Sequence, residues 1–320
     1  MDNRYILGID TSNYKTSIAI IDRNHHIICD LRRFLKVKQG EKGLRQSDAL
    51  FQHVKNLPEL IEEAESYIHG NLDGIAYSSR PRPVEGSYMP VFLAGETVSR
   101  SMGAVLDVPV LAFSHQEGHI EAIKHFSSFA EEKRVLACHF SGGTTELLDV
   151  ASSENGYDVK IIGGSKDISY GQVLDRAGVL LGMDFPAGEA LDDLALKSVA
   201  ASSVLTGIKV NDGWLNLSGL DTQIKRVLEN TNRSESIGAV IKEAFIIIAD
   251  SMARMIIQGS EKSGVDKVLL AGGVSSSKFI KEILTVKLKD AGIEASFDNN
   301  GLSQDNAVGT ALLGGKAIWH

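Results

Sequence analysis

The chain has 320 residues, of which 43% are hydrophobic and 23% charged, a balance typical of a globular protein with two domains or one large duplicated unit. Its 41 acidic and 33 basic residues give a net charge of −8, so the overall charge does not favour nucleic-acid binding, and any RNA contact would need a local basic patch. The two cysteines, Cys29 and Cys138, lie far apart in the sequence, each after an apolar stretch, so we expect buried thiols in a cytoplasmic protein. No apolar run is long enough to suggest a membrane span.

Two hairpins of the same design are expected, one in each half of the chain. Residues 4–10 predict an apolar strand that ends in an acid, residues 11–16 a polar turn, and residues 17–22 a returning strand. The same order recurs mid-chain: a strand over 134–140, a turn over 141–145 and a returning strand over 146–150. This repetition indicates internal duplication.

Helical segments are expected after each hairpin. Residues 46–67 predict an amphipathic helix that is broken near Pro58, with His53 in a structural position on its apolar face. Residues 88–105 predict a largely apolar helix. Residues 234–263 predict a long helix whose apolar middle is interrupted by charges, so we expect a core helix.

The chain ends with a predicted strand, turn and two helices. Residues 267–270 read as a strand that leads into Ala271-Gly272-Gly273 and then a helix. The last helix is expected to begin near Ser303 and to carry Asp305.

The five residues His115-Gln116-Glu117-Gly118-His119 are the strongest indication of chemistry. They follow an apolar run, 108–113, that predicts a buried strand, and Ser114 could cap the helix that begins after it. Histidines four positions apart on a helix lie on one face, with Cβ atoms about 5–6 Å apart, so both rings could reach one metal ion. Zinc peptidases have the order H-E-x-x-H instead, which argues against that class. Considered alone, the pair is explained equally well as two surface histidines.

Three turns rich in glycine, serine or threonine each follow a predicted strand. Backbone N–H groups in such turns can approach a phosphate closely, and hydroxyl groups add donors. Together the turns predict a nucleotide cleft between two duplicated α/β halves. The two hairpin turns would face the phosphates, and Ala271-Gly272-Gly273 would cover the adenosine side.

In their order along the chain, several motifs resemble those of the TsaD family, over residues 6–314: Gly8-Ile9-Asp10-Thr11-Ser12, His115–His119, Ser141-Gly142-Gly143-x-Thr145, Ala271-Gly272-Gly273-Val274-Ser275 and Asp305-Asn306. That family, once labelled O-sialoglycoprotein endopeptidase, makes threonylcarbamoyladenosine in tRNA. The resemblance implies an α/β fold of duplicated actin-like ATPase (ASKHA, ribonuclease H-like) domains with a central nucleotide cleft. We assign residues 1–130 to the first half, with a C-terminal helix over 303–320 packing back on it, and residues 131–302 to the second half.

The resemblance also implies a site. His115, His119 and Asp305 would bind one divalent metal, iron or zinc. An ATP- or AMP-type nucleotide and the substrate would contact Thr11, Ser12, Ser141, Gly142, Gly143, Thr145, Asp175, Gly188, Gly272, Gly273 and Ser277. In the family reaction the metal holds the threonyl part of threonylcarbamoyl-AMP, the exocyclic amine of a tRNA adenine attacks the carbamoyl carbon, and AMP leaves. TsaB- or TsaE-like proteins are possible partners, and a dimer is a further possibility.

The chain departs from the family pattern at the predicted site. Two acids of the first turn are Tyr14 and Lys15 here, which reverses the local charge and would favour an anion. At four further places this chain differs from the family. It has Arg80-Pro81-Arg82-Pro83 where the family has a Gly-Pro-Gly loop, Thr144 in place of a histidine, Ser277 in place of an asparagine and Glu189 in place of a proline. Lys15, Arg80, Arg82 and Thr144 are candidate substrate contacts, although Arg80 and Arg82 fit equally well as solvated loop charges.

These departures are typical of a divergent paralogue, and no catalytic residue is assigned. The leading hypothesis is a threonylcarbamoyl transferase acting on tRNA. The alternatives are a carbamoyltransferase-like enzyme with a non-tRNA acceptor and a catalytically silent ATP-binding partner of a true TsaD. A kinase of the same superfamily is disfavoured by the predicted metal ligands.

Overall fold

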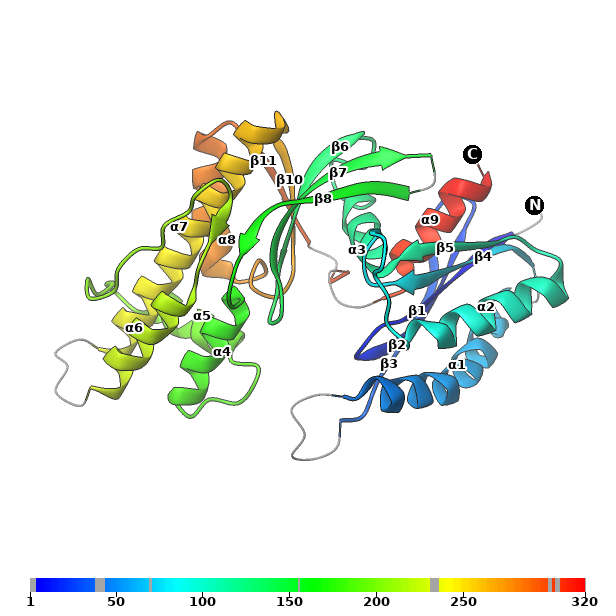
Figure 1. Ribbon diagram of the computed structural model, residues 1–320, viewed down its shortest axis with the longest axis horizontal. Coiled ribbons are helices and arrows are strands. Elements are labelled where there is room, and N and C mark those ends of the chain that lie inside the picture. The colour runs from blue at the N-terminus through cyan, green and yellow to red at the C-terminus, as the bar shows by residue number, and fades with distance from the viewer. Residues whose placement is uncertain are drawn as a thin grey trace. The chain divides into compact units, whose positions relative to one another are not determined.

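The computed structural model describes residues 4–37, 44–68, 71–154, 156–230, 236–298, 301–302 and 306–319 (Figure 1). The chain forms two compact units. The first comprises Met1–Phe126, Ser152–Asp158 and Asn300–His320, and the second comprises Ser127–Ala151 and Val159–Asn299. The division expected from the sequence differs from these units chiefly at 152–158, a segment that packs with the first unit.

The first unit is built on a five-stranded sheet with the order β3-β2-β1-β4-β5. Its strands are β1 (Tyr5–Thr11), β2 (Lys15–Asp22), β3 (Ile27–Phe34), β4 (Leu72–Arg80) and β5 (Val110–Ser114). The first three strands form an antiparallel meander, whereas β1, β4 and β5 run parallel to one another. The carboxyl ends of these three parallel strands therefore meet at one edge of the sheet, where open α/β sheets place ligand groups.

Successive residues of β1 point to opposite faces of this sheet, and each face is covered by helices. On one face, Thr11 contacts Gly95 of α2 (Phe92–Leu106), and α1 (Gln46–Ile68) packs beside α2. On the other face lie α3 (His115–Lys124) and α9 (Val308–Trp319). A Cβ on Gly8 would lie 2.6 Å from the carbonyl oxygen of Ala307, so this strand position needs glycine for α9 to pack closely. Asp10 has the same parity as Gly8 and therefore faces α3 and α9.

Three sequence predictions for the first unit are corrected by the structure. The helix at 46–67 is not broken at Pro58 but continues as α1 to Ile68. Pro58 lies on the exposed face, while Leu57 and Leu60 are buried on either side of it, and this packing offsets a cost of about 3 kcal/mol for proline inside a helix. The helix expected from residue 88 begins at Phe92.

The last helix likewise begins later than expected, at Val308 rather than near Ser303. Asn306 Oδ1 accepts a hydrogen bond from the backbone N–H of Val308 at 2.9 Å, and this contact satisfies a donor at the start of α9. Asp305, which was expected on the helix, lies outside the described residues.

The second unit contains a six-stranded sheet with the order β11-β10-β6-β7-β8-β9. Its strands are β6 (Arg134–Phe140), β7 (Thr145–Ser153), β8 (Gly156–Ser165), β9 (Trp214–Leu215), β10 (Lys267–Ala271) and β11 (Glu294–Phe297). The β6–β7 hairpin repeats the β1–β2 hairpin, and β10 runs parallel to both β6 and β11. The two hairpins expected from the sequence are therefore both present.

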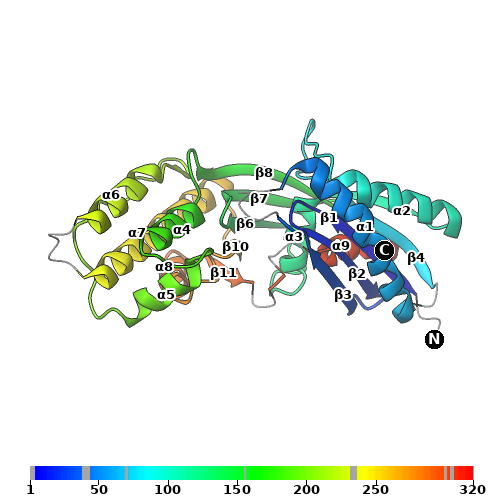
Figure 2. The same ribbon diagram turned by 90° about the horizontal axis from the view of Figure 1, so that it is seen from below.

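In the described part of the second unit, five helices accompany this sheet: α4 (Tyr170–Leu180), α5 (Gly188–Lys197), α6 (Ser218–Glu229), α7 (Ile237–Ser263) and α8 (Lys278–Asp290) (Figure 2). The helix α7 contacts α5, α6 and α8, and its Phe245, Ile248 and Met252 are fully buried. The prediction of a core helix is thus confirmed. Within the described part of the chain, no helix combines the length and apolarity needed to cross a bilayer. Cys29 and Cys138 are both unpaired and buried.

Candidate functional site

The start of α3 is fixed by its own sequence. Ser114 has extended backbone angles, and its hydroxyl accepts the backbone N–H of Glu117 at 3.2 Å. In return, Glu117 Oε2 accepts the backbone N–H and the hydroxyl of Ser114, each at 2.7 Å. This reciprocal capping box confirms Ser114 as the helix cap. It places His115 in the first turn and His119 one turn later on the same face.

The two histidine rings meet at their ε nitrogens. Nε2 of His115 lies 2.9 Å from Nε2 of His119, and the ring planes are inclined at 77°. The other ring nitrogen of His115, Nδ1, lies 2.8 Å from Oδ1 of Asp10, a carboxylate that is fully buried at the end of β1. A proton on Nδ1 would be donated to this carboxylate, and the lone pair on Nε2 would then point towards His119.

These contacts fit a metal site in the first unit. Metal-binding histidines typically donate their second ring N–H to a carboxylate, which fixes the tautomer and the ring orientation, and Asp10 stands in that place. Two nitrogens bound to one tetrahedral zinc ion at about 2.0–2.1 Å would lie about 3.3–3.4 Å apart, so the two rings would separate slightly from their 2.9 Å contact to share a metal. Among the residues that the structure describes, no cluster of three or more histidine, cysteine, aspartate or glutamate side chains forms a complete ligand set. Asp305, the third predicted ligand, is outside those residues.

The polar turn after β1 is held by a network around His53. His53 is fully buried, with Nε2 2.8 Å from the Ser12 carbonyl oxygen and Nδ1 2.9 Å from Thr16 Oγ1. Burial lowers the pKa of this imidazole, so it remains neutral near pH 7. The Thr11 hydroxyl donates to the Val91 carbonyl at 3.0 Å, and the Ser12 N–H donates to Asp10 Oδ2 at 3.3 Å. His53 is therefore structural, as predicted, and supports the residues beside the histidine pair.

The residues of the first unit that depart from the family pattern differ in their burial and in their contacts. Lys15 is buried, and its Nζ lies 4.6 Å from the ring centroid of Phe34. Tyr14, the other replaced acid, is 54% exposed. Arg80 at the end of β4 donates to the Ser79 hydroxyl at 3.2 Å, and the backbone N–H of Arg82 donates to the Ser87 hydroxyl at 3.0 Å. Lys15 begins β2 and Arg80 ends β4, and both of these strand ends lie at the sheet edge that carries Asp10.

In the second unit, the turn from Ser141 to Thr145 packs tightly against α4. Ser141 Oγ accepts the backbone N–H of Thr144 at 3.1 Å, and Thr145 Oγ1 accepts that of Tyr170 at 3.0 Å. A Cβ on Gly171 would lie 2.5 Å from Cα of Gly142, so only glycine permits this approach. The backbone of the turn is thereby fixed, as a phosphate-binding turn requires.

Asp175 belongs to the same region. It projects from α4, and its Oδ1 accepts the backbone N–H of Ala187 at 3.0 Å, next to Gly188 at the start of α5. Its Oδ2 lies 3.9 Å from the position that a Cβ on Gly142 would take. The structure thus brings Asp175, Gly142 and Gly188 into one neighbourhood of the second unit.

The turn after β10 requires a glycine at residue 272. Gly272 has φ +95°, and a Cβ there would lie 2.4 Å from the Phe140 carbonyl oxygen. Ser277 caps α8, since its Oγ accepts the Ile280 N–H at 3.1 Å and donates to Asp192 Oδ1 at 2.6 Å. Its hydroxyl is therefore engaged in holding α5 to α8.

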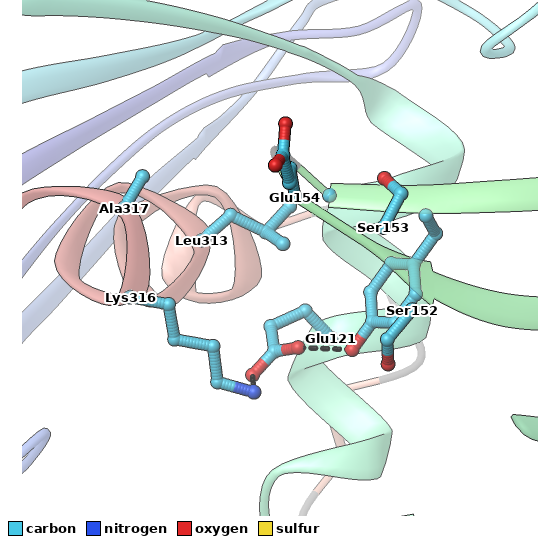
Figure 3. Close-up of a pocket in the computed structure, with 9 residues that line it drawn as sticks. Glu121, Ser152, Ser153, Glu154, Leu313, Lys316 and Ala317 are labelled. Carbon is cyan, nitrogen blue, oxygen red and sulfur yellow. Dashed lines mark hydrogen bonds and ion pairs between the residues drawn. The ribbon is translucent and has the colours of Figure 1, made fainter. Parts of the chain in front are cut away.

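A small cavity of about 110 Å³ lies in the first unit near the other end of α3 (Figure 3). Glu121 is about 9 Å further along the helix axis than His115, given the rise per residue. Its fully buried carboxylate faces Lys316, whose Nζ is 2.7 Å from Oε1. The cavity is lined also by Ser152, Ser153, Glu154, Gly156, Tyr157, Leu313 and Ala317. It is separate from the histidine pair.

Comparison with known proteins agrees with these features. The family model described as TsaD, tRNA N6-adenosine threonylcarbamoyltransferase, matches residues 36–312. The chain belongs to the TsaD family. Proteins named tRNA N6-adenosine threonylcarbamoyltransferase from Neorickettsia sennetsu and Thermus thermophilus are each 28% identical to it, over 96% of this chain and 92% and 91% of theirs.

Solved structures support the fold of this TsaD family member. HypF from T. kodakarensis matches 99% of this chain and 48% of its own, with a TM-score of 0.61 at 16% identity. Component A of the (R)-2-hydroxyglutaryl-CoA dehydratase of Acidaminococcus fermentans matches 99% of both chains, with a TM-score of 0.57 at 14% identity. A ROK hexokinase from Thermus thermophilus matches 97% of both chains, with a TM-score of 0.51 at 14% identity. These likenesses confirm the actin-like ATPase type of α/β fold.

From the sequence, Asp10 is only the acid at the end of the first predicted strand and a member of the Gly8–Ser12 motif, with no role assigned to it. In the structure Asp10 is the carboxylate that contacts His115. The signal that could have found it is an acid at the carboxyl end of a strand, since this is where parallel sheets gather ligand groups.

Proposed function

We propose that the protein transfers a threonylcarbamoyl group from threonylcarbamoyl-AMP to the exocyclic amine of a tRNA adenine. The observation that carries this proposal is the contact of Asp10 with His115, and of His115 with His119, inside a member of the TsaD family. In the reaction the amine nitrogen forms a bond to the carbamoyl carbon and loses a proton. The bond from that carbon to the AMP phosphate oxygen breaks, and AMP departs with the electron pair.

The first unit would hold the acyl group of the donor. We propose that His115, His119 and Asp305 hold one divalent metal, iron or zinc, which would supply Lewis-acid stabilisation of charge on the donor. Asp10 would keep His115 in the tautomer that presents Nε2. Lys15 and Arg80 would place positive charge at the same sheet edge and favour an anionic group there, alongside Thr11, Ser12 and Arg82.

The second unit would hold the AMP part. We propose that the turn formed by Ser141, Gly142, Gly143, Thr144 and Thr145 presents backbone N–H groups to phosphate. Asp175, Gly188, Gly272, Gly273 and Ser277 would complete the adenine nucleotide site. The close packing of Gly171 on Gly142 supports this role, because a phosphate-binding backbone must be rigid before the ligand arrives.

A carbamoyltransferase-like activity on a non-tRNA acceptor is the second candidate. It is favoured by Lys15, which is buried at a position where the family has an acid. We also propose that the protein works in the cytoplasm, with TsaB- or TsaE-like proteins as partners and a dimer as a possible assembly.

The proposal is tested by reconstitution. Purified protein with its pathway partners, ATP, threonine, bicarbonate and unmodified tRNA should yield threonylcarbamoyladenosine, detected by mass spectrometry of the digested tRNA. Product that appears on a small-molecule acceptor but not on tRNA would favour the second candidate. If neither product forms while the Thermus thermophilus relative is active in the same mixture, the result would favour a catalytically silent ATP-binding partner of a true TsaD.

A further inference from the structure

The helix that carries the histidine pair has two buried carboxylates on its opposite face. At 100° per residue, Glu117 and Glu121 lie about 200–240° around α3 from His115, on the side of the helix opposite the pair. Both carboxylates are buried, at 4% and 0% exposure. Burying a carboxylate is costly unless it is hydrogen-bonded, so the groups that contact these two must determine where the helix can sit.

One residue, Tyr157, satisfies both carboxylates. Its backbone N–H donates to Glu117 Oε1 at 3.2 Å, and its hydroxyl donates to Glu121 Oε2. Burial raises the pKa of the Tyr157 hydroxyl, so that group remains a donor. Glu121 is also paired with Lys316 of α9, which is the ion pair visible in Figure 3. Tyr157 follows the turn between β7 and β8, in the segment Ser152–Asp158 that packs with the first unit.

Gly156 makes this approach possible. Its φ is +135°, and a Cβ there would lie 2.5 Å from Glu117 Oε1. Any side chain at this position would therefore force apart the segment and the carboxylate that accepts the Tyr157 N–H. The same carboxylate closes the capping box with Ser114, the residue directly before His115. An unbroken chain of contacts thus runs from Tyr157 through Glu117 to the start of the histidine helix.

We propose that Tyr157, docked through Gly156 onto Glu117 and Glu121, is a positioning residue that sets the placement of His115 and His119 relative to Asp10. It touches neither histidine and acts only through α3. This inference rests on the proposed metal role of the pair, but its structural part concerns the metal-free protein as well. Nothing in the H-Q-E-G-H spacing identifies it, because the partner is 40 residues away along the chain.

Two variants test the docking. Tyr157→Phe removes the hydroxyl, keeps the ring and does not touch the Ser114–Glu117 contacts, whereas Gly156→Ala forces the backbone donor and the Glu117 carboxylate apart. Their matched controls lie in the second unit. Tyr170→Phe removes another buried hydroxyl, which lies 2.8 Å from Ser251 Oγ, and Gly264→Ala strains another glycine, with φ +72° and nothing within 4 Å of its Cβ.

The first readout is the dissociation constant for Co²⁺, measured through the absorption of the bound ion. We expect Tyr157→Phe and Gly156→Ala to raise it about tenfold, the lower end of the effect of outer-shell partners, and to change the absorption spectrum. Both controls should stay within about twofold of the wild type, which lies inside the usual scatter of such effects. The second readout is the imidazole ¹⁵N spectrum of the metal-free protein, in which both variants should perturb the His115 tautomer signal.

The possible results can be told apart. The inference is overturned if folded Tyr157→Phe protein matches the wild type in both readouts, or if the controls shift as much as the variants. If the wild type binds no Co²⁺, the metal role proposed for the pair fails, and the imidazole spectra alone decide whether Tyr157 positions the histidines. Transfer activity is not needed for either readout, so a failed reconstitution would leave this test intact.

Discussion

Oδ1 of Asp10 lies 2.8 Å from Nδ1 of His115, across 105 residues of sequence. This contact joins the end of the first strand to the first residue of the helix that carries the histidine pair. It explains why a buried acid stands at the end of β1, and a proton on His115 Nδ1 would be held by this carboxylate. The metal site that we propose depends on this contact.

Replacing Asp10 by asparagine should weaken metal binding. Asp10→Asn keeps the size of the side chain but removes the charge that favours a proton on His115 Nδ1. We expect the dissociation constant for Zn²⁺ or Co²⁺ to rise about 10–100-fold, as for other outer-shell carboxylates. The measurement is a metal titration against a competing chelator.

The matched control for that change is Asp22→Asn. Asp22 also contacts a histidine ring, His26, at 3.2 Å, but at the other end of β2 in an exposed position. Its replacement should leave metal affinity unchanged. Equal losses in Asp10→Asn and Asp22→Asn would contradict a specific role for Asp10.

His53 should make the stability of the protein depend on pH. Burial lowers the pKa of the imidazole in the folded state. Its contribution to the free energy of unfolding is therefore complete above the unfolded-state pKa of about 6.5 and is lost as the pH falls towards the folded-state pKa. In wild-type protein the free energy of unfolding should fall by up to about 1.4 kcal/mol per pH unit from this group as it is lowered below about pH 6.5.

Urea unfolding at about pH 7.5 and about pH 5.5 tests this dependence, since that window brackets an ordinary histidine pKa. His53→Gln should lose about 1–3 kcal/mol at the higher pH, because the Thr16 hydroxyl and the Ser12 carbonyl lose their buried partner. The variant should also show a flatter pH dependence. The pKa values of the Asp22, Asp73 and Asp167 carboxyls are lowered from 3.8, so these groups titrate below the pH window of this measurement. Identical slopes in variant and wild type would refute this role of His53.

Gly171→Ala should weaken nucleotide binding by the second unit. The added Cβ would lie 2.5 Å from Gly142 Cα and 2.6 Å from the Ser141 carbonyl oxygen, so the turn must move. We expect the dissociation constant for AMP to rise at least about tenfold, as expected when ordered backbone donors are displaced by about 1 Å.

Gly219→Ala is the control for that variant, to be compared by calorimetry. Gly219 is likewise the second residue of its helix, and nothing lies within 4 Å of a Cβ there. Its substitution should leave AMP binding unchanged. An unaltered affinity in folded Gly171→Ala would exclude the turn as a nucleotide contact.

Lys15→Met should reduce affinity for an anionic donor while keeping the fold. The thioether retains most of the buried stem, so the change removes mainly the charge. We expect a loss of about 1–2 kcal/mol of binding free energy, or roughly a tenfold rise in the dissociation constant, with a weaker salt dependence. Lys55→Met is the control, because Lys55 also lies over an aromatic ring, that of Phe51, but on the surface of α1. A shift of the same size in both variants would remove Lys15 from the list of substrate contacts.

The parts of the fold that follow local rules were predictable from the sequence. Apolar runs joined by a polar turn predicted both hairpins, and Ser114 as a helix cap predicted the start of α3. Pro58 was misleading, because packing of Leu57 and Leu60 outweighs the local cost of proline. The late start of α9 was also missed. The residue whose side chain accepts an N–H at the start of the helix is Asn306, not the expected Ser303.

Long-range contacts could not be predicted in this way. The spacing of His115 and His119 indicated a pair of ligands, but the partners of their helix, Asp10 and Tyr157, are remote in sequence. Such contacts depend on which strand ends meet at one sheet edge and on which face of α3 is buried. The family motifs predicted the candidate site and included Asp10, whereas the contacts of Asp10 and Tyr157 with α3 emerged only from the structure.

The most direct test of the central claim is the amount of threonylcarbamoyladenosine formed per tRNA by wild-type protein and by His115→Ala. Both are assayed with the same partners, ATP, threonine and bicarbonate, and the digested tRNA is quantified by mass spectrometry. We predict product with the wild type and a loss of at least about 100-fold with His115→Ala, as expected when a group that stabilises developing charge is removed. Equal product from both proteins, or none from the wild type where the Thermus thermophilus relative succeeds, would contradict the account.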